Sequence, residues 1–472
     1  MVSLSQVYQV TVSSPWNAYT PSKGMSGRGS VFNPTYPIFV FDYQTGQIAV
    51  GYVVGTTGYA LFGQGDANYL TLPAIYLTPF GYNYVFAGGG ECSVSGCMQN
   101  GSNACGPWWI IVNLSSNSVN TYCTGLIPNN PATAHLQGVF IDLVNGNLLI
   151  DFSGTSNTNF VINIIPLSNL NQVIQNQAPS NLKSVWINLP SNISGASQYA
   201  NQGTLFNGNY VQPLYSSNGP YVFVVPLSDI YSSAVTGEPS SSSSPINIGT
   251  AYSVATLSQM NASIVGVVFN GSTEQLALGV PSGSNYNVYV LNTSFSVVSS
   301  YSFTYQGSQI GFAHAFWNGV FLLPSYSSST IYVNVYTSSY EYASESGQFG
   351  FVTSEGYFVV ASQSLTSSSV TFTIYQILLD HTYVFQNVSI TVSGNTVTAT
   401  GTLFDLTQNS AVSGATVYLV QVNSIDDNYS GDVTPLTSGT TNQNGQFSIS
   451  YTVSSSGSGQ VYYGVYYPGS QL

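Results

Sequence analysis

The chain alternates short apolar runs with turn residues in a unit that recurs along the sequence. Three copies are plainest, at residues 264–291, 310–337 and 350–377. In each, two β-rich runs flank a two-residue turn, and a Ser/Gly/Asn break then leads to a third, alternating run. The turn dipeptides are Asn270-Gly271, Asn318-Gly319 and Glu355-Gly356. Asn-Gly favours a hairpin because a type I′ turn needs φ > 0 at both central residues. The pattern therefore predicts antiparallel hairpins with one apolar face.

The same unit occurs earlier with looser spacing. Residues 138–165 turn at Asn145-Gly146, and residues 203–229 turn at Asn207-Gly208. Two further copies are expected at 38–77 and 82–122. Similar sheets that recur every 40 to 60 residues or so predict a β-propeller of about seven blades, with six or eight left open. We expect residues 7–12 to supply the outer strand of the last blade and so close the ring.

The blade pattern ends near residues 380–387, which predicts a propeller over residues 1–383 and a second domain over 384–472. From Val388 the runs are typical of the strands of a small sandwich. Amphipathic helical stretches are nearly absent; residues 167–177 are the best candidate and are equally compatible with a loop. Residues 231–250, which include EPSSSSSP, predict a flexible surface loop. The expected fold class is all-β.

Two motifs in the last part carry a resemblance. Residues 411–417 read AVSGATV, and residues 441–447 read TNQNGQF. This combination resembles prokaryotic Ig-like surface modules, which carry a V-x-G-A-x-V strand and then a T-(D/N)-x-x-G-x-F turn and strand. The resemblance covers roughly the last 85 residues and implies an Ig-like β-sandwich. It gives no information about a ligand, because such modules serve as spacers and adhesive stalks.

These modules have one more edge strand after the stretch that resembles residues 466–469. The sequence stops at Leu472, so the expected sheet has an open edge, which proteins normally pair or protect. Three alternatives remain: the native chain continues, another chain adds a strand, or this sandwich lacks the strand.

Charge is scarce and one-sided. Lys23, Arg28 and Lys183 are the only strong bases, against 16 carboxylates, and the formal net charge is −13. Nucleic acid and anionic membrane surfaces are therefore not expected as partners. Because few carboxylates can pair with bases, their protonation removes few native interactions. This favours an acid-stable protein outside the cell over an ordinary secreted one. No run of about 18 apolar residues exists, so no membrane insertion is expected.

Cysteines and glycosylation triplets also indicate an extracellular protein. Cys92, Cys97, Cys105 and Cys123 form one local cluster, which predicts two disulfides with three possible pairings. Zinc is the rival, but the spacing lacks paired C-x-x-C and thiolate ligation fails in acid. Candidate N-glycosylation sites are Asn100, Asn113, Asn192, Asn261, Asn270, Asn292, Asn387 and Asn428. The N-terminus is not a signal peptide, which leaves trimming, or another route such as virion assembly, as explanations.

Candidate catalytic groups are few. Asp142 and Asp151 flank a hairpin turn and suggest a glycosidase pair, but we expect them to be exposed positions on one blade. Asp426, Asp427 and Asp432 suggest a Ca²⁺ site, but a solvated loop is favoured. We expect no metal and no cofactor. Trp108 and Trp109, beside the cysteines, form the preferred ligand-binding candidate as a sugar-stacking platform, against the alternative of core packing.

Composition and architecture together resemble extracellular proteins of acidothermophilic archaea and their viruses, including large tail-fibre proteins of spindle-shaped viruses. The resemblance implies a non-enzymatic, oligomeric attachment protein: a virion tail fibre or spike that contacts a host cell-surface protein or glycan and other virion subunits. The alternative is a cellular surface or S-layer-associated adhesin. An acid-stable glycan-active hydrolase comes third, since propellers also host enzymes.

Overall fold

The computed structural model describes most of the chain, in segments. The described residues are 1–13, 38–42, 47–54, 57–64, 76–80, 83–88, 108–113, 118–123, 136–153, 158–169, 172, 181–193, 203–214, 216–237, 243–254, 263–270, 273–310, 315–317, 320–336, 339–352, 356–362, 369–426, 432–454 and 461–469. Strands dominate these segments, so the prediction of an all-β chain is confirmed. They form nine sheets, of which seven are arranged as in a propeller.

The first three sheets come from the first half of the chain. The first sheet contains β2 (Ile38–Asp42), β3 (Gln47–Val54) and β4 (Thr57–Gln64). The second contains β5 (Tyr76–Phe80), β6 (Asn83–Gly88), β7 (Trp108–Asn113) and β8 (Ser118–Cys123). The third contains β9 (Leu136–Asp142), β10 (Asn147–Ser153), β11 (Asn159–Pro166), β12 (Lys183–Asn188) and β16 (Val235–Thr236).

Four more sheets complete the series. The fourth contains β13 (Thr204–Phe206), β14 (Asn209–Leu214), β15 (Tyr221–Pro226) and β17 (Thr250–Ser253). The fifth contains β18 (Ser263–Asn270), β19 (Thr273–Ser282), β20 (Asn285–Leu291) and β21 (Val297–Thr304). The sixth contains β22 (Gln309–Ile310), β23 (Ala315–Trp317), β24 (Val320–Ser327), β25 (Thr330–Tyr336) and β26 (Tyr340–Ser346). The seventh contains β27 (Phe349–Val352), β28 (Tyr357–Ala361), β29 (Ser369–Leu378) and β1 (Ser3–Ser13).

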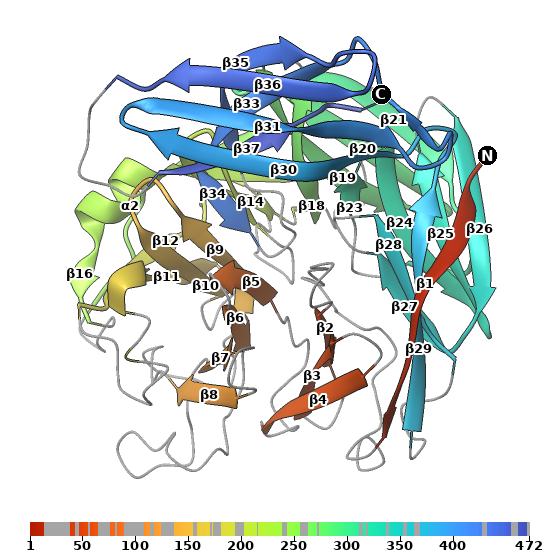
Figure 1. Ribbon diagram of the computed structural model, residues 1–472. Coiled ribbons are helices and arrows are strands. Elements are labelled where there is room, and N and C mark those ends of the chain that lie inside the picture. The colour runs from red at the N-terminus through yellow and green to blue at the C-terminus, as the bar shows by residue number, and fades with distance from the viewer. Residues whose placement is uncertain are drawn as a thin grey trace.

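These seven sheets lie around a common centre (Figure 1). Each is an antiparallel meander, and the apolar cores lie between neighbouring sheets. Phe160 of the third sheet, for example, packs against Tyr210 and Phe223 of the fourth. Central strands such as β11 and β15 are buried along most of their length and read as nearly continuous apolar runs, whereas the outer strands β21 and β26 are largely exposed and alternate. The arrangement is propeller-like.

The first and last strands of the ring pair with each other. Strand β1 runs antiparallel to β29, from Ser3 opposite Leu378 to Ser13 opposite Ser369, with an irregularity between Gln6 and Tyr8. In Figure 1 the red N-terminal strand lies alongside β29. The prediction that residues 7–12 supply the outer strand of the last sheet is therefore confirmed.

The turns follow their sequences where the structure describes them. Asn207 and Gly208 have φ of 49° and 73°, so both central residues of this turn take the left-handed conformation that a type I′ turn requires. Asn145 and Gly146 belong to a four-residue turn, and only Gly146 of the two has a positive φ, at 67°.

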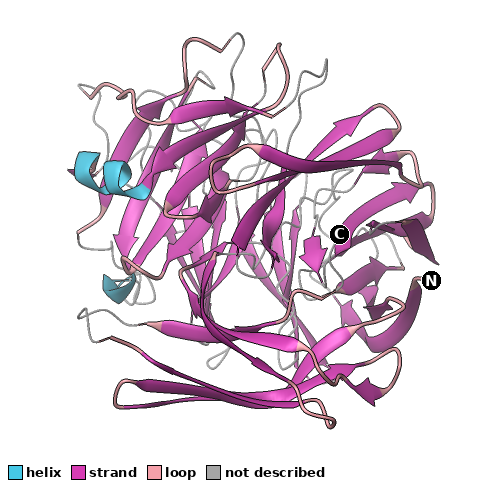
Figure 2. Cartoon of the chain, turned by 90° about the horizontal axis from the view of Figure 1, so that it is seen from above, coloured by secondary structure: helices cyan, strands magenta, loops and turns pink. Residues whose placement is uncertain are grey.

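The last two sheets face each other across a separate apolar core (Figure 2). One contains β30 (Tyr383–Ser393), β31 (Thr396–Asp405), β32 (Ser410–Ala411) and β36 (Gln446–Thr452). The other contains β35 (Val433–Thr440), β33 (Thr416–Val422) and β37 (Tyr462–Tyr466), with β33 in the middle. We call these two sheets the sandwich. It lies across the ring of smaller sheets (Figure 1).

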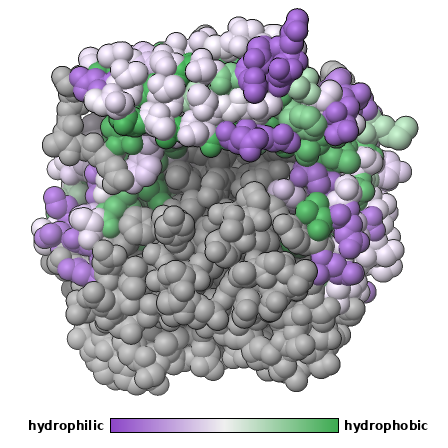
Figure 3. Space-filling model, viewed as in Figure 1, coloured by the Kyte–Doolittle hydropathy of each residue, from purple (hydrophilic) through white to green (hydrophobic). Residues whose placement is uncertain are grey.

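The visible face of the sandwich is mainly white and purple, with green residues interspersed (Figure 3). Weakly polar residues therefore make up much of this surface, as expected from the abundance of Ser, Thr, Asn and Tyr. Single exposed apolar side chains such as Val392, at 60% exposure, interrupt it.

Two local predictions were wrong. Residues 76–80 form β5, which pairs with β6 and so belongs to the second sheet, not to the copy at 38–77. The segment 231–250 is not one surface loop, since α2 (Leu227–Ser233) extends into it and β16 pairs with β12. Residues 167–177, expected as helix or loop, begin with a short 3₁₀ helix, η4 (Leu167–Asn169), and most of the remainder lies outside the described residues. The helix α2 forms where Ile230 and Leu227 bury their side chains against the fourth sheet.

Candidate functional site

The sandwich is joined to the ring by a strand of its own. Strand β34 (Ser424–Asp426) pairs antiparallel with β9, with Ser424 opposite Asp142, and thereby extends the third sheet by one strand. The amide of Leu143 also donates a hydrogen bond of 2.9 Å to the carbonyl of Asn423. In Figure 1, β34 lies below the sandwich strands and reaches the ring. We call this contact region the junction.

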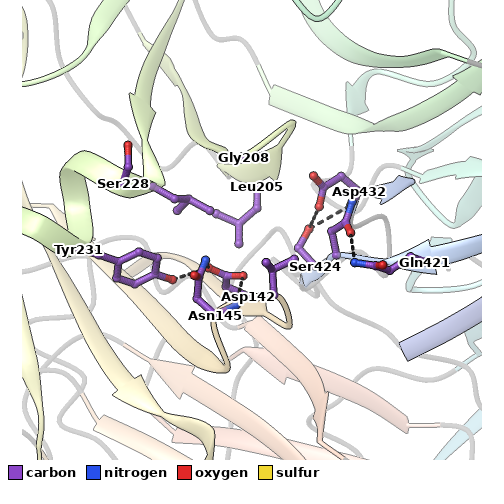
Figure 4. A pocket seen from close by; sticks show the side chains of 12 residues that line it. Asp142, Asn145, Leu205, Gly208, Ser228, Tyr231, Gln421, Ser424 and Asp432 are labelled. Carbon is purple, nitrogen blue, oxygen red and sulfur yellow. Dashed lines mark hydrogen bonds between the residues drawn. The ribbon is translucent and has the colours of Figure 1, made fainter. Parts of the chain in front are cut away.

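A cavity of about 480 Å³ lies at the junction. The turn after β9, the turn between β13 and β14, helix α2 and four residues of the sandwich part, Gln421, Asn423, Ser424 and Asp432, surround it (Figure 4). The side chains that line it carry mostly hydroxyl, amide or carboxyl groups, and two leucines and a valine add apolar surface. The lining residues are Asp142, Val144, Asn145, Leu205, Gly208, Leu227, Ser228, Tyr231, Gln421, Asn423, Ser424 and Asp432.

Asp142 anchors the side of the cavity that belongs to the ring. Its carboxyl accepts hydrogen bonds from the amide N–H of Asn145 at 3.1 Å and from the side-chain N–H of Asn145 at 2.7 Å. The hydroxyl of Tyr231, on α2, donates to the same carboxyl at 2.5 Å. Burial, followed by the Asp142 charge, raises the pKa of Tyr231, so the phenol stays protonated. These contacts fix both the turn after β9 and helix α2 at the cavity wall.

Asp432 anchors the opposite side of the cavity. Its carboxyl accepts a hydrogen bond from the amide of Asn207 at 3.0 Å, which ties the sandwich to the β13–β14 turn. The hydroxyl of Ser424 donates to its other carboxyl oxygen. Burial raises the pKa of Asp432 to about 6, and the Asp142 charge adds to this effect against the two hydrogen bonds.

Glu274, on β19 of the fifth sheet, completes the junction. Its carboxyl accepts a hydrogen bond from the backbone amide of Val433, the residue after Asp432. Burial, reinforced by the charge of Asp432, raises the pKa of Glu274 to about 8. Three carboxyl groups from three different sheets and segments therefore meet at one interface.

The prediction that Asp142, Asp151 and Asp432 are exposed was wrong. Asp142 and Asp151 are 2% and 0% exposed, and Asp432, expected in a solvated loop, is 5% exposed. Asp151 lies opposite Gly138, further along the hairpin than Asp142, which faces Asn147. The hydroxyl of Tyr210, from the next sheet, contacts the Asp151 carboxyl. Asp142 and Asp151 therefore make separate polar contacts. The neighbouring fourth sheet covers Asp151, and the sandwich covers Asp142.

Trp108 and Trp109 lie on β7, where their backbones pair with Gly88 and Ala87 of β6. Their side chains, and Cys92, Cys97 and Cys105, fall outside the described residues, and Cys123 is placed only as a backbone position opposite Trp108. The sugar platform and the two disulfides therefore stay predictions. The side chains of Asp426 and Asp427 are likewise outside the described residues.

The glycosylation candidates also lie partly inside and partly outside the described residues. Asn192 and Asn387 are exposed, the latter at an irregularity of β30 with φ of 52°. Asn292 is partly buried, and its side-chain oxygen accepts hydrogen bonds from the amides of Ser294 and Ser296. Asn113 and Asn270 are described only as backbone, and Asn100, Asn261 and Asn428 lie outside the described residues.

Sequence patterns gave no sign of Tyr231 and Gln421 at the cavity or of Glu274 at the junction. The three residues belong to separate elements of the chain, and the docking of the sandwich brings them to one region. A general signal was present in the scarcity of charge: a carboxyl group within an apolar strand, such as Asp142 after Phe140 and Ile141, is a candidate for a buried role.

Within the described segments, no group of three or more His, Cys, Asp and Glu side chains is arranged to hold a metal ion. No helix in these segments has the length and apolar character needed to cross a membrane.

Comparisons with known proteins found similar shapes but no relative in sequence. No protein-family model matches the chain, and no curated protein matches it. Among solved structures, the CNH domain of AfRom2 matches at 10% identity with a TM-score of 0.36, over 79% of this chain and 98% of that one. A quinoprotein alcohol dehydrogenase-like protein from Bacteroides thetaiotaomicron matches at 10% identity with a TM-score of 0.37, over 84% of each chain. An exo-β-1,3-galactanase from Phanerochaete chrysosporium matches at 11% identity with a TM-score of 0.32, over 96% and 98%.

Proposed function

We propose that the protein is a non-enzymatic, extracellular attachment protein: a seven-bladed β-propeller that carries an Ig-like sandwich and acts as a virion tail fibre or spike. Three strong bases in the whole chain support an acid-stable exterior role, because few native contacts depend on ionised carboxylates. The exposed asparagines at Asn192 and Asn387 are accessible for glycans on such a protein. A cellular adhesin of the same build is the alternative.

The ligand that fits the junction cavity is a neutral glycan. The polar groups of the lining are hydroxyl, amide and carboxyl groups, and none of the described lining residues is a base. Such side chains exchange hydrogen bonds with sugar hydroxyl groups, whereas an anionic ligand needs Lys or Arg. The size of the cavity, about 480 Å³, lies in the range of small-molecule sites. This set of polar groups without a base among the described lining residues is the observation that carries the proposal.

Binding of the full chain to an array of neutral oligosaccharides at about pH 3 tests the proposal, since an acid-stable fold stays intact there. Ser228 is exposed, lies on α2 and lines the cavity, so Ser228→Trp fills the cavity without removing the contacts of Asp142 or Asp432. Ser232→Trp, also exposed on α2 but outside the lining, is the matched control. We expect Ser228→Trp alone to abolish binding. Binding that survives this change, or no binding to any oligosaccharide, would contradict the proposal.

A glycan-active hydrolase is a second candidate because two carboxyl groups, Asp142 and Asp432, line the same cavity. Glycosidic cleavage uses two carboxyl groups on either side of the scissile bond, one as the acid and the other as the base or nucleophile. Against this, both carboxyls already accept hydrogen bonds that hold the junction together. Release of reducing ends from a bound oligosaccharide, lost in Asp142→Asn, would establish the enzyme.

The viral and cellular alternatives differ in where the native protein is found. Purification from its source followed by intact mass measurement distinguishes them. Co-purification with capsid proteins would support the tail fibre, whereas a glycosylated species in cell-envelope fractions would support the adhesin.

A further inference from the structure

The contacts between the sandwich and the ring at the junction converge on carboxyl groups. Asp432 of the sandwich segment accepts a hydrogen bond from Asn207 of the ring, and Glu274 of the ring accepts one from Val433 of the sandwich. Asp142 lies opposite Ser424 in the strand pair that connects the two parts. The carboxyl groups of Asp432 and Glu274 are therefore part of the docking contact itself, whereas Asp142 contributes its backbone to the strand pair and its carboxyl accepts hydrogen bonds from Asn145 and Tyr231 of the ring.

No positive charge balances these groups within the described residues. The ion pairs found there join the N-terminal amine to Glu341 and Asp380, and His381 to Asp405. Among the described side chains, the titratable groups that face the junction are Asp142 of β9, Tyr231 of α2, Glu274 of β19 and Asp432, none of which is a base. Buried carboxylates without a counter-ion carry both a desolvation cost and mutual repulsion.

We propose that the junction is a pH-dependent lock, which holds the sandwich on the ring while the carboxyl groups of Asp432 and Glu274 are protonated and releases it when they ionise.

The hydrogen bonds at the junction are compatible with docking of the sandwich when the carboxyl groups are protonated and with its release when they ionise. A protonated carboxyl retains a carbonyl oxygen, which can accept the amide hydrogen of Asn207 or Val433 without a buried charge. An ionised carboxyl keeps these contacts, but the two neighbouring negative charges of Glu274 and Asp432 then repel each other in a region of low polarity. Undocking relieves this repulsion because it exposes both groups to water.

The direction of the pH effect follows from linkage. Burial at the docked junction raises the pKa of Asp432 to about 6 and the pKa of Glu274 to about 8. Both values lie above the pKa of a carboxyl group exposed to water. Docking is therefore fully stabilised below the ordinary carboxyl pKa, and its stability falls as pH rises through this range. The protein is locked in acid and loosened above neutrality, the opposite of an ordinary salt-bridged interface.

Hydrogen exchange of the full chain, wild type against the Glu274→Gln/Asp432→Asn double variant, tests the lock. The wild type and the double variant are compared with each other at the same pH, so that the intrinsic exchange rates cancel. Both substitutions keep an amide oxygen for the same backbone donors and remove the charge. At about pH 9 we expect peptides covering β34 and β9 to exchange at least tenfold or so faster in the wild type than in the double variant. At about pH 4 the two proteins should exchange alike in these peptides.

Glu341→Gln, on outer strand β26 and away from the junction, is the matched control and should leave the wild-type pattern unchanged. Small-angle scattering of the unmodified protein gives a measurement that needs no variant. We expect the radius of gyration to increase between about pH 4 and about pH 9, as the sandwich separates from the ring. Equal exchange of wild type and double variant at high pH, or a constant radius of gyration, would overturn the lock.

Discussion

The backbone amide of Val433 donates a hydrogen bond to the carboxyl group of Glu274, although the two residues are 159 positions apart. This contact joins β35 of the sandwich to β19 of the ring, beside the strand pair of β34 with β9. The sandwich therefore rests on the ring through backbone pairing and buried side chains. Its orientation is therefore fixed by the junction rather than by the short connection between β29 and β30.

Tyr210→Phe tests the buried polar contact between the third and fourth sheets. The ring of Tyr210 packs against Phe140 and Phe160, and its hydroxyl contacts Asp151 and lies 2.8 Å from the side-chain oxygen of Gln212. Removing only the hydroxyl keeps the packing and weakens the partners' hydrogen bonding. We expect a loss of about 1–3 kcal/mol in the free energy of unfolding, measured with denaturant. The same change at Tyr332, which is partly exposed, should have a much smaller effect.

Deletion of residues 1–13 tests ring closure. Strand β1 pairs along its length with β29, and Leu4 packs against the core shared by the sixth and seventh sheets. We expect the deletion to lower the free energy of unfolding by on the order of 3 kcal/mol, from lost strand pairing and apolar burial. A synthetic peptide with the sequence SLSQVYQVTVS, added to the truncated protein, should restore the melting temperature in a concentration-dependent way. Unchanged stability after deletion would contradict the closure role.

Asp405→Asn tests a carboxyl group whose pH effect opposes that of the junction. Burial raises its proton affinity, but hydrogen bonds from His381 and from the amides of Thr382, Gln408 and Thr407 outweigh it and lower the pKa of Asp405. A lowered pKa contributes stability above about pH 4 that is lost as pH falls through the folded-state value. The variant should therefore melt below the wild type at neutral pH and approach it near pH 2 or so. A larger difference in acid would contradict the assignment.

Gly279→Ala and Gly283→Ala separate close packing from backbone conformation within one hairpin. A Cβ at Gly279 would collide with the side chain of Tyr286, which is fully buried, whereas a Cβ at Gly283 meets no atom within 4 Å. Gly283 has φ of 61°, so alanine there costs about 1 kcal/mol of backbone strain. At Gly279 we expect a loss of about 3 kcal/mol or more, because a packed core cannot relax around the clash. Urea unfolding of both variants compares the two costs directly.

The four cysteines give a prediction that rests on the sequence. Cys92, Cys97, Cys105 and Cys123 cluster in an otherwise cysteine-free chain, so we expect two disulfides. The unfolded but unreduced protein should take up no thiol-alkylating reagent, and the reduced protein should take up four equivalents. Alkylation without reduction would favour free thiols or a metal site.

Local features of the fold were predictable because local chemistry decides them. Asn207-Gly208 specifies its turn through the backbone conformations that these two residues tolerate. The repeat pattern left the last sheet without an outer strand, and the apolar run at residues 7–12 was available to supply it. The candidate site was not predictable in this way. The burial of Asp142 and Asp432 depends on how the sandwich meets the ring, a contact between segments nearly 300 residues apart for which no local pattern exists. Their charge suggested exposure, and tertiary packing overrode it.

The pairing of β1 with β29 also affects the order of events during synthesis. Strand β1 leaves the ribosome before the rest of the ring, and its partner, Ser369–Leu378, is made only after most of the ring. At 5–20 residues per second or so, β1 waits for roughly 20 to 75 seconds with its backbone groups unpaired. During this interval it is an exposed strand edge, open to pairing with a neighbouring nascent chain. The ring therefore closes late, and the yield of folded protein should depend on how many chains are being made close together.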